Sequence, residues 1–263
     1  MASRRAIISV SDKTGILEFA KELVKMDYEL VSTGGTYQTI KEAGIPVTYV
    51  SEVTGFPEIL DGRVKTLNPR IHGGILAMRT PEHLAQLEEH NITPIDLVVV
   101  NLYPFRQTIS KPGVELAEAI ENIDIGGPSM IRAAAKNYQY VTVVTNPGKY
   151  QEVLQRLQDG AVDEAYRLQL SAEAFRHTAE YDTFITTYLQ KQTGIKEDFP
   201  DNFLLLAEKR QELRYGENAQ QRAALYSRFG DDEQGVAQAV QLTGLQLSYN
   251  NTLDLDAAME VVR

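Results

Sequence analysis

Residues 97–101 read Leu-Val-Val-Val-Asn, an apolar run that ends in an amide. A run without polar residues at alternate positions is typical of a strand that is covered on both faces, as in a parallel sheet. Residues 141–145 repeat the pattern, and shorter β-rich runs occupy residues 5–10, 28–31 and 47–50. The sequence therefore predicts several short strands whose central members are buried.

Helical patterns lie between these strands. Apolar residues at positions 16, 19, 20, 23 and 24 have the i, i+3, i+4, i+7, i+8 spacing of an amphipathic helix. We also expect helices over residues 37–43, 129–136 and 148–157. Strands that alternate with helices over short connections predict an α/β fold built on an open parallel sheet with helices on both faces.

The pattern changes in the second half of the chain. Residues 163–190 contain neither Gly nor Pro, and Tyr181 belongs to an aromatic and apolar helical stripe that we expect to pack against a neighbouring element. Residues 194–202 are polar and rich in turn formers, which indicates a linker. We therefore expect a first domain over residues 1–195 and the incomplete start of a second over 203–263, because that segment is too short for an independent core and stops within a helical pattern.

Composition excludes several classes of function. The chain has 26 Lys+Arg and 36 Asp+Glu among 263 residues, a formal charge of −10, so we expect no nucleic-acid partner and no binding to an anionic membrane. Cysteine is absent, which excludes disulfides, thiol catalysis and cysteine-rich zinc sites. The four histidines lack metal-ligand spacing, so we expect no metal. Without a signal peptide or an apolar run of about 20 residues, a cytoplasmic protein is expected.

Two turns have a composition suited to phosphate. Residues 11–15, Ser-Asp-Lys-Thr-Gly, and residues 33–36, Thr-Gly-Gly-Thr, each follow a predicted strand and precede a predicted helix. Free N–H groups and the helix dipole at such turns attract anions. Neither turn matches a P-loop, and simple helix capping is the alternative for each one. Two such turns at one edge of the same sheet favour a binding site.

Charged and polar residues elsewhere could complete that site. Arg63 and Lys65 lie on one face if residues 62–66 are extended, although two solvated charges, or a pair of Arg63 with Asp61, are equally consistent with the sequence. Tyr103, which follows the most apolar run, is either a phenol donor or an edge tyrosine. Asp124 lies between two isoleucines, which would raise its pKa as suits a general base, but it could also cap the helix that Lys136 closes.

Taken together, the motifs resemble the bifunctional purine-biosynthesis family that joins IMP cyclohydrolase to AICAR formyltransferase. The first five motifs cover residues 9–15, 32–36, 62–67, 101–105 and 122–127, and four more cover residues 132–137, 175–179, 213–218 and 247–251. The resemblance implies a methylglyoxal-synthase-like first domain with a helical extension, followed by the start of a cytidine-deaminase-like formyltransferase domain.

The resemblance also implies a reaction, in which the carboxamide nitrogen of FAICAR attacks the formyl carbon of the same molecule and water is lost to give IMP. Asp124 would take the carboxamide proton, Lys65 and Tyr103 would stabilise the oxyanion, and Lys136 would pass a proton to the departing hydroxyl. No cofactor is needed for this step. The residues implied to hold the ribose phosphate and the base are Ser11, Asp12, Lys13, Thr33, Gly34, Gly35, Thr36, Arg63, Thr66, Asn101, Ile125 and Gly126.

For the second activity the resemblance implies 10-formyltetrahydrofolate as cofactor, AICAR contacts by Arg214 and Tyr215, and a homodimer. The family's Lys-His motif would follow residues 248–251 further along the chain, so we expect no formyl transfer from these 263 residues. Asn68 stands where the family usually has histidine, and Ala219-Gln220 replaces a Pro-His or Ser-His pair. A phosphate-sensing module of the same fold and methylglyoxal synthase are the alternative functions.

Overall fold

The computed structural model of the chain describes residues 4–195, 201–229 and 235–262. Most of the predicted linker, residues 196–200, lies outside this described part. The chain forms two compact units, residues 1–182 and 183–263, and each is described here by itself.

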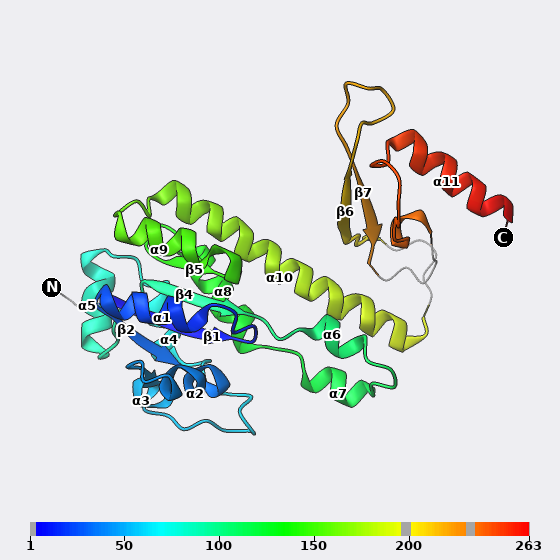
Figure 1. Cartoon of the computed structure of the whole chain (residues 1–263). Helices are drawn as coiled ribbons and strands as arrows, with labels where there is room; N and C mark the ends of the chain where they lie inside the picture. Colours follow the sequence, from blue (N-terminus) through cyan, green and yellow to red (C-terminus); the bar gives the residue numbers. More distant parts are fainter. Residues whose placement is uncertain (1–3, 196–200, 230–234, 263) are drawn as a thin grey trace. The chain divides into compact units, whose positions relative to one another are not determined.

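The first unit contains a five-stranded sheet in which every neighbouring pair is parallel, in the order β3-β2-β1-β4-β5 (Figure 1). Its strands are β1 (Arg4–Val10), β2 (Tyr28–Ser32), β3 (Thr48–Tyr49), β4 (Leu97–Asn101) and β5 (Thr142–Val144). All five residues of β4 are buried, so both faces of the sheet are covered at its centre. The predicted open parallel α/β sheet is confirmed.

The helices of this unit fill the connections between strands. They are α1 (Ile16–Lys25), α2 (Gly34–Glu42), α3 (Val50–Thr54), α4 (Pro69–Leu76), α5 (Pro81–Glu89), α6 (Phe105–Ile109), α7 (Leu116–Glu121), α8 (Gly126–Lys136), η1 (Pro147–Lys149), α9 (Tyr150–Gln158) and α10 (Glu164–Thr193), the last of which runs on into the second unit. Phe19 of α1 stacks on Tyr150 of α9 with ring centroids 4.5 Å apart. The side-chain amide of Asn137 donates to the carbonyls of Ile75 and Ala77, which ties the end of α8 to the end of α4.

The strand order reverses between β1 and β4, which opens a crevice at their carboxyl ends. From β1 the chain moves to β2 on one side, whereas β4 pairs with β1 on the other side, with Ala6 opposite Leu97 and Val10 opposite Asn101. In open α/β sheets, ligands bind at the carboxyl ends of the strands on either side of such a reversal. The sheet therefore places the segments after β1, β2 and β4 around one point.

Three local expectations differ from the structure. Helices α2 and α8 begin at Gly34 and Gly126, a few residues before their predicted starts, because the glycine turns form the first helical residues. Only residues 48 and 49 of the expected strand 47–50 are extended. Residues 62–66 form a turn rather than an extended stretch, since Leu60, Asp61 and Gly62 all have positive φ, 55°, 53° and 87°.

The second unit contains an antiparallel hairpin and a terminal helix. Its elements are β6 (Ala207–Leu213), β7 (Ala223–Arg228), η2 (Val236–Gln238) and α11 (Tyr249–Val262). The Arg214 N–H donates to the Leu247 carbonyl at 2.7 Å, which joins the end of β6 to the segment before α11. None of the helices in the described ranges has the length and apolar character that crossing a membrane requires.

Candidate active site

A cavity of about 600 Å³ opens at the carboxyl ends of β1, β2 and β4. It brings together fourteen of the predicted site residues: Ser11, Lys13, Thr33, Gly34, Gly35, Thr36, Arg63, Lys65, Thr66, Asn101, Tyr103, Asp124, Ile125 and Gly126. They come from segments far apart in the sequence, so the sheet, rather than any local motif, assembles the site.

Two ammonium groups lie over the first turn of α2. A Cβ atom added to Gly34 would lie 3.7 Å from Nζ of Lys65, and one added to Gly35 would lie 3.8 Å from Nζ of Lys13. Gly34 has a φ of 51°, a conformation that glycine adopts without strain. A helix N-terminus flanked by two cations is suited to a phosphate group, because backbone N–H groups and both charges can converge on its oxygens.

The side chain of Asn101 shapes the loop after β1. Its Oδ1 accepts hydrogen bonds from the Ser11 and Asp12 N–H groups at 2.7 and 2.9 Å, and its Nδ2 donates to the Asp12 carbonyl at 3.0 Å. The Asp12 carboxylate turns back to accept from the Thr14 N–H at 2.9 Å and does not line the cavity. Asn101 therefore bridges β4 and β1, and its side-chain amide is already engaged on both of its polar atoms.

The Thr36 hydroxyl also forms hydrogen bonds within the protein. Its hydroxyl accepts from the Val10 N–H at 3.0 Å and donates to the Val10 carbonyl at 2.9 Å. The side chain is buried and holds the start of α2 against the end of β1. Thr36 lines the cavity, but its hydroxyl already donates its one proton within the protein.

Asp124 is half-buried in the loop between α7 and α8. Its Oδ1 accepts the Gly127 N–H at 2.9 Å, so the carboxylate caps α8 while it faces the cavity. Burial raises the pKa of Asp124, and the Gly127 N–H and the charge of Lys65 oppose that rise. The carboxyl group thus combines a higher basicity than an exposed aspartate with a fixed position.

Lys65 is held by a carboxylate that sequence analysis missed. Its Nζ lies 3.1 Å from Oε1 of Glu58, and the Tyr49 hydroxyl donates to the same carboxylate at 2.5 Å. The hydrogen bond from Tyr49, followed by the interaction with Lys65, lowers the pKa of Glu58 despite partial burial. Glu58 lies in a loop without a recognisable motif, so only the folded structure places it beside Lys65.

Arg63 and Tyr103 lie at the more open side of the cavity. Arg63 forms an ion pair with Glu121 of α7, and both side chains are exposed. Tyr103 lies two residues after the end of β4 and is 56% exposed. Both side chains line the cavity and remain accessible to a ligand.

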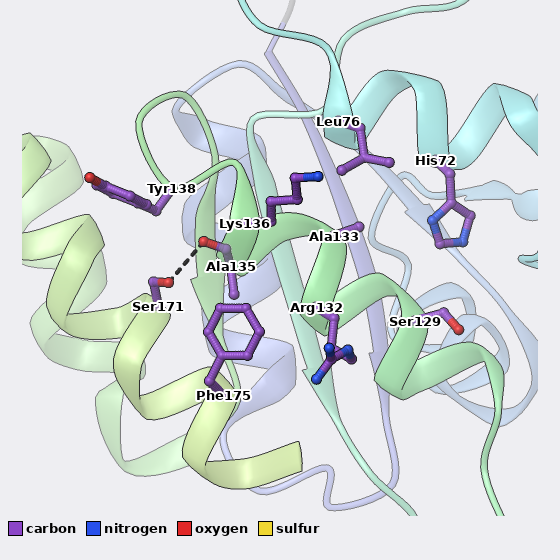
Figure 2. Close-up of a pocket in the computed structure, with 10 residues that line it drawn as sticks. All are labelled: His72, Leu76, Ser129, Arg132, Ala133, Ala135, Lys136, Tyr138, Ser171 and Phe175. Carbon is purple, nitrogen blue, oxygen red and sulfur yellow. Dashed lines mark hydrogen bonds between the residues drawn. The ribbon is translucent and has the colours of Figure 1, made fainter. Parts of the chain in front are cut away.

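Lys136 lies in a different place. It lines a separate pocket of about 610 Å³ together with residues of α4, α8 and α10, among them His72, Arg132 and Phe175 (Figure 2). Lys136 ends α8, ten residues after Gly126, and a helix rises about 15 Å over that span. Lys136 and Asp124 therefore line different pockets, and the expectation that they serve one site stays a prediction.

The remaining predicted residues belong to the second unit. The Arg214 guanidinium lies over the Tyr215 ring, 5.0 Å from its centroid. Within the described part of the chain, no group of three or more His, Asp or Glu side chains is placed to hold a metal ion.

Comparison with known proteins shows that two family models match this chain. Residues 15–129 match the model of the MGS-like domain, which runs from the start of the first helical connection into α8. Residues 134–263 match the model of the AICARFT/IMPCHase bienzyme. The two models meet within α8, so α9, α10 and the second unit fall in the bienzyme match.

Relatives match nearly the whole chain. It is 58% identical over 262 residues to the bifunctional purine biosynthesis protein PurH of Halalkalibacterium halodurans, covering 99% of this chain and 51% of the relative. It is 54% identical over 265 residues to PurH of Bacillus subtilis, covering 100% of this chain and 51% of the relative. The chain thus spans about half the length of these curated relatives.

A solved structure agrees with the fold. The crystal structure of ForH superposes with a TM-score of 0.65 at 36% sequence identity, covering 70% of this chain and 98% of that one. The matched models, the relatives and this structure lead to one conclusion. The chain belongs to the family of bifunctional purine biosynthesis proteins.

Proposed function

We propose that the cavity of the first unit closes FAICAR to IMP with loss of water, the IMP cyclohydrolase reaction. The observation that carries the proposal is that Asp124 shares one cavity with the ammonium groups of Lys13 and Lys65, which lie over Gly35 and Gly34. A sugar phosphate and a reacting amide would then be bound at opposite sides of the same space.

Binding begins at the phosphate. The ribose 5-phosphate would lie at the N-terminus of α2 beside Lys13, with the loop of Ser11 held in place by Asn101. The base would extend along Thr66 and the start of α8, where a Cβ on Gly126 would lie 2.6 Å from Oγ1 of Thr66. That close approach excludes a side chain at position 126.

The chemistry then needs one base and a set of donors. The carboxamide nitrogen forms a bond to the formyl carbon and gives up one proton, which Asp124 accepts. The formyl oxygen becomes an alkoxide, which Lys65 and Tyr103 stabilise and protonate. The proton on Asp124 returns to Lys65 through solvent. Lys65 then protonates the hydroxyl, which leaves as water, while the formamido nitrogen releases its proton to solvent and the C=N bond of IMP forms. A positioned base contributes roughly 10²–10⁴ in rate and each oxyanion donor roughly 10²–10³.

Proton delivery to the departing hydroxyl falls to Lys65 in this proposal. Lys136, the other candidate, lies ten residues after Gly126 along α8 and lines the second pocket. Glu58 keeps the Lys65 ammonium aimed into the cavity. No metal ion or cofactor takes part in these steps.

The test is turnover of FAICAR by the 263-residue chain, followed as IMP formation by absorbance. Asp124→Asn and Lys65→Met should each lower kcat by at least about 10²-fold. Lys21→Ala, which removes an exposed lysine of α1, is the control for loss of one positive charge and should leave kcat unchanged.

Two other outcomes would identify a different function. Tight binding of IMP without turnover would indicate a phosphate-sensing module. Release of methylglyoxal from dihydroxyacetone phosphate would indicate methylglyoxal synthase.

For the whole protein we propose the second activity of the family, formylation of AICAR by 10-formyltetrahydrofolate, in a cytoplasmic homodimer. The word bifunctional in the names of the relatives supports a second activity. Arg214 and Tyr215 would contact AICAR as adjacent cationic and aromatic groups.

A further inference from the structure

Tyr181 of α10 contacts the loop that carries Asp124 from outside the cavity. The Asp124 backbone N–H donates to the Tyr181 hydroxyl at 2.7 Å. The same hydroxyl donates to the Asn122 carbonyl at 3.4 Å. The side chain is 5% exposed, so both hydrogen bonds are shielded from water.

The ring of Tyr181 contacts a second segment of the site. Its edge packs against Phe105, with centroids 6.2 Å apart and planes at 71°. Phe105 begins α6, and its N–H donates to the Tyr103 carbonyl at 2.7 Å. One side chain of α10 therefore touches both segments that carry Asp124 and Tyr103.

We infer that Tyr181 is a positioning residue for the proposed ring closure, which fixes the Asp124 loop by its hydroxyl and the Tyr103 segment by its ring. The inference rests on the proposed function, because Asp124 and Tyr103 receive their roles there. Tyr181 lies outside the residues matched by the MGS-like model and within those matched by the bienzyme model. The helix after the MGS-like domain thus supplies the element that sets the geometry of the base.

The hydroxyl is suited to this double contact. Burial raises the pKa of Tyr181 to about 12, so the group stays protonated at neutral pH and can accept one hydrogen bond while it donates another. Without it, the Asp124 N–H would lose its acceptor and the loop would shift to find a water molecule. A misplacement of about 1 Å at a reacting group can lower the rate about 10²-fold.

The experiment compares Tyr181→Phe with Tyr166→Phe. Tyr166 is also a buried tyrosine of α10 but lies fifteen residues earlier, about 22 Å along the helix. We expect Tyr181→Phe to lower kcat for FAICAR by ten- to a hundredfold with KM changed less than threefold. The acidic limb of its pH profile should move to lower pH, because a looser loop lets water reach the Asp124 carboxylate.

A second measurement does not depend on turnover. Hydrogen exchange at the Asp124 amide should be at least tenfold faster in Tyr181→Phe than in the unchanged chain, and unchanged in Tyr166→Phe. Unaltered exchange, or equal losses of kcat in the two variants, would overturn the inference. If the unchanged chain fails to convert FAICAR, the proposed function fails, while exchange still decides whether Tyr181 fixes the loop.

Discussion

Gly127→Ala tests whether the position of the Asp124 carboxylate controls the reaction. A Cβ atom at position 127 would lie 2.7 Å from Cδ2 of Leu102 and 3.0 Å from Cγ of Asp124, and closer still to Oδ2 of Asp124. The Gly127 N–H also donates to the same carboxylate. The added methyl group therefore pushes on the proposed base directly.

The size of the effect follows from these distances. Carbon atoms in contact lie about 3.5–4.0 Å apart, so Leu102 and the carboxyl group must move by roughly 0.5–1.3 Å. A displacement of that size predicts a loss in kcat of about 10²-fold. Overpacking costs about 1–3 kcal/mol, and alanine in place of a helical glycine regains about 0.5–1 kcal/mol. The net loss of about 0–2.5 kcal/mol leaves a protein of ordinary stability folded.

The assay pairs IMP formation with thermal unfolding of the same variant. Gly235→Ala is the matched control, because its Cβ would meet its nearest neighbour, Oε1 of Gln238, at 3.5 Å, an ordinary contact. We expect a large loss of kcat with a small shift in Tm for Gly127→Ala and neither change for Gly235→Ala. A Gly127→Ala variant that keeps kcat within threefold of the unchanged chain would refute the reasoning.

Three further predictions follow from the site and its burial. The kcat of ring closure should fall as the pH drops through the pKa of Asp124, which burial holds above its ordinary value of 3.8, and a profile without an acidic limb would argue against Asp124 as the base. Asn101→Ala should raise KM for FAICAR at least tenfold and lower the free energy of unfolding by about 1–3 kcal/mol, because the loop after β1 loses its hydrogen-bond acceptor. Steady-state kinetics and urea unfolding measure the two effects, and an unchanged KM would contradict the assignment. Burial lowers the pKa of His72 and His177 below 6.5, so the unfolded state takes up protons first as the pH falls. The free energy of unfolding should therefore decrease below about pH 6.5. Tm values at pH 7.5 and 5.5 check this, and equal values would contradict it.

The fold was predictable because its signals are local. The apolar run at residues 97–101 matches β4 residue for residue, and the spacing of Ile16, Phe19 and Leu23 matches the buried face of α1. The general place of the site was predictable for the same reason, since turns that follow parallel strands meet at one edge of the sheet.

The inner arrangement of the site was not predictable from local patterns. Residues of one type can serve either the ligand or the fold, and Thr36 and Asn101 turn out to hydrogen-bond with the backbone at the end of β1. No spacing rule predicts that Glu58 contacts Lys65 or that Tyr181 contacts the Asp124 N–H. The family resemblance implied a catalytic role for Lys136, whereas the structure shows it ten residues after Gly126 along α8, in the other pocket.

The pairing of β1 with β4 also has a consequence for synthesis of the chain. Ser11 and its acceptor Asn101 are separated by 90 residues. At a translation rate of about 5–20 residues per second, the ribosome needs roughly 5–18 s to add the partner of β1 on that side. During this interval one edge of β1 has no neighbour and its apolar residues are open to other chains. Overexpression at low temperature, which slows synthesis further, would lengthen the period in which nascent chains can aggregate.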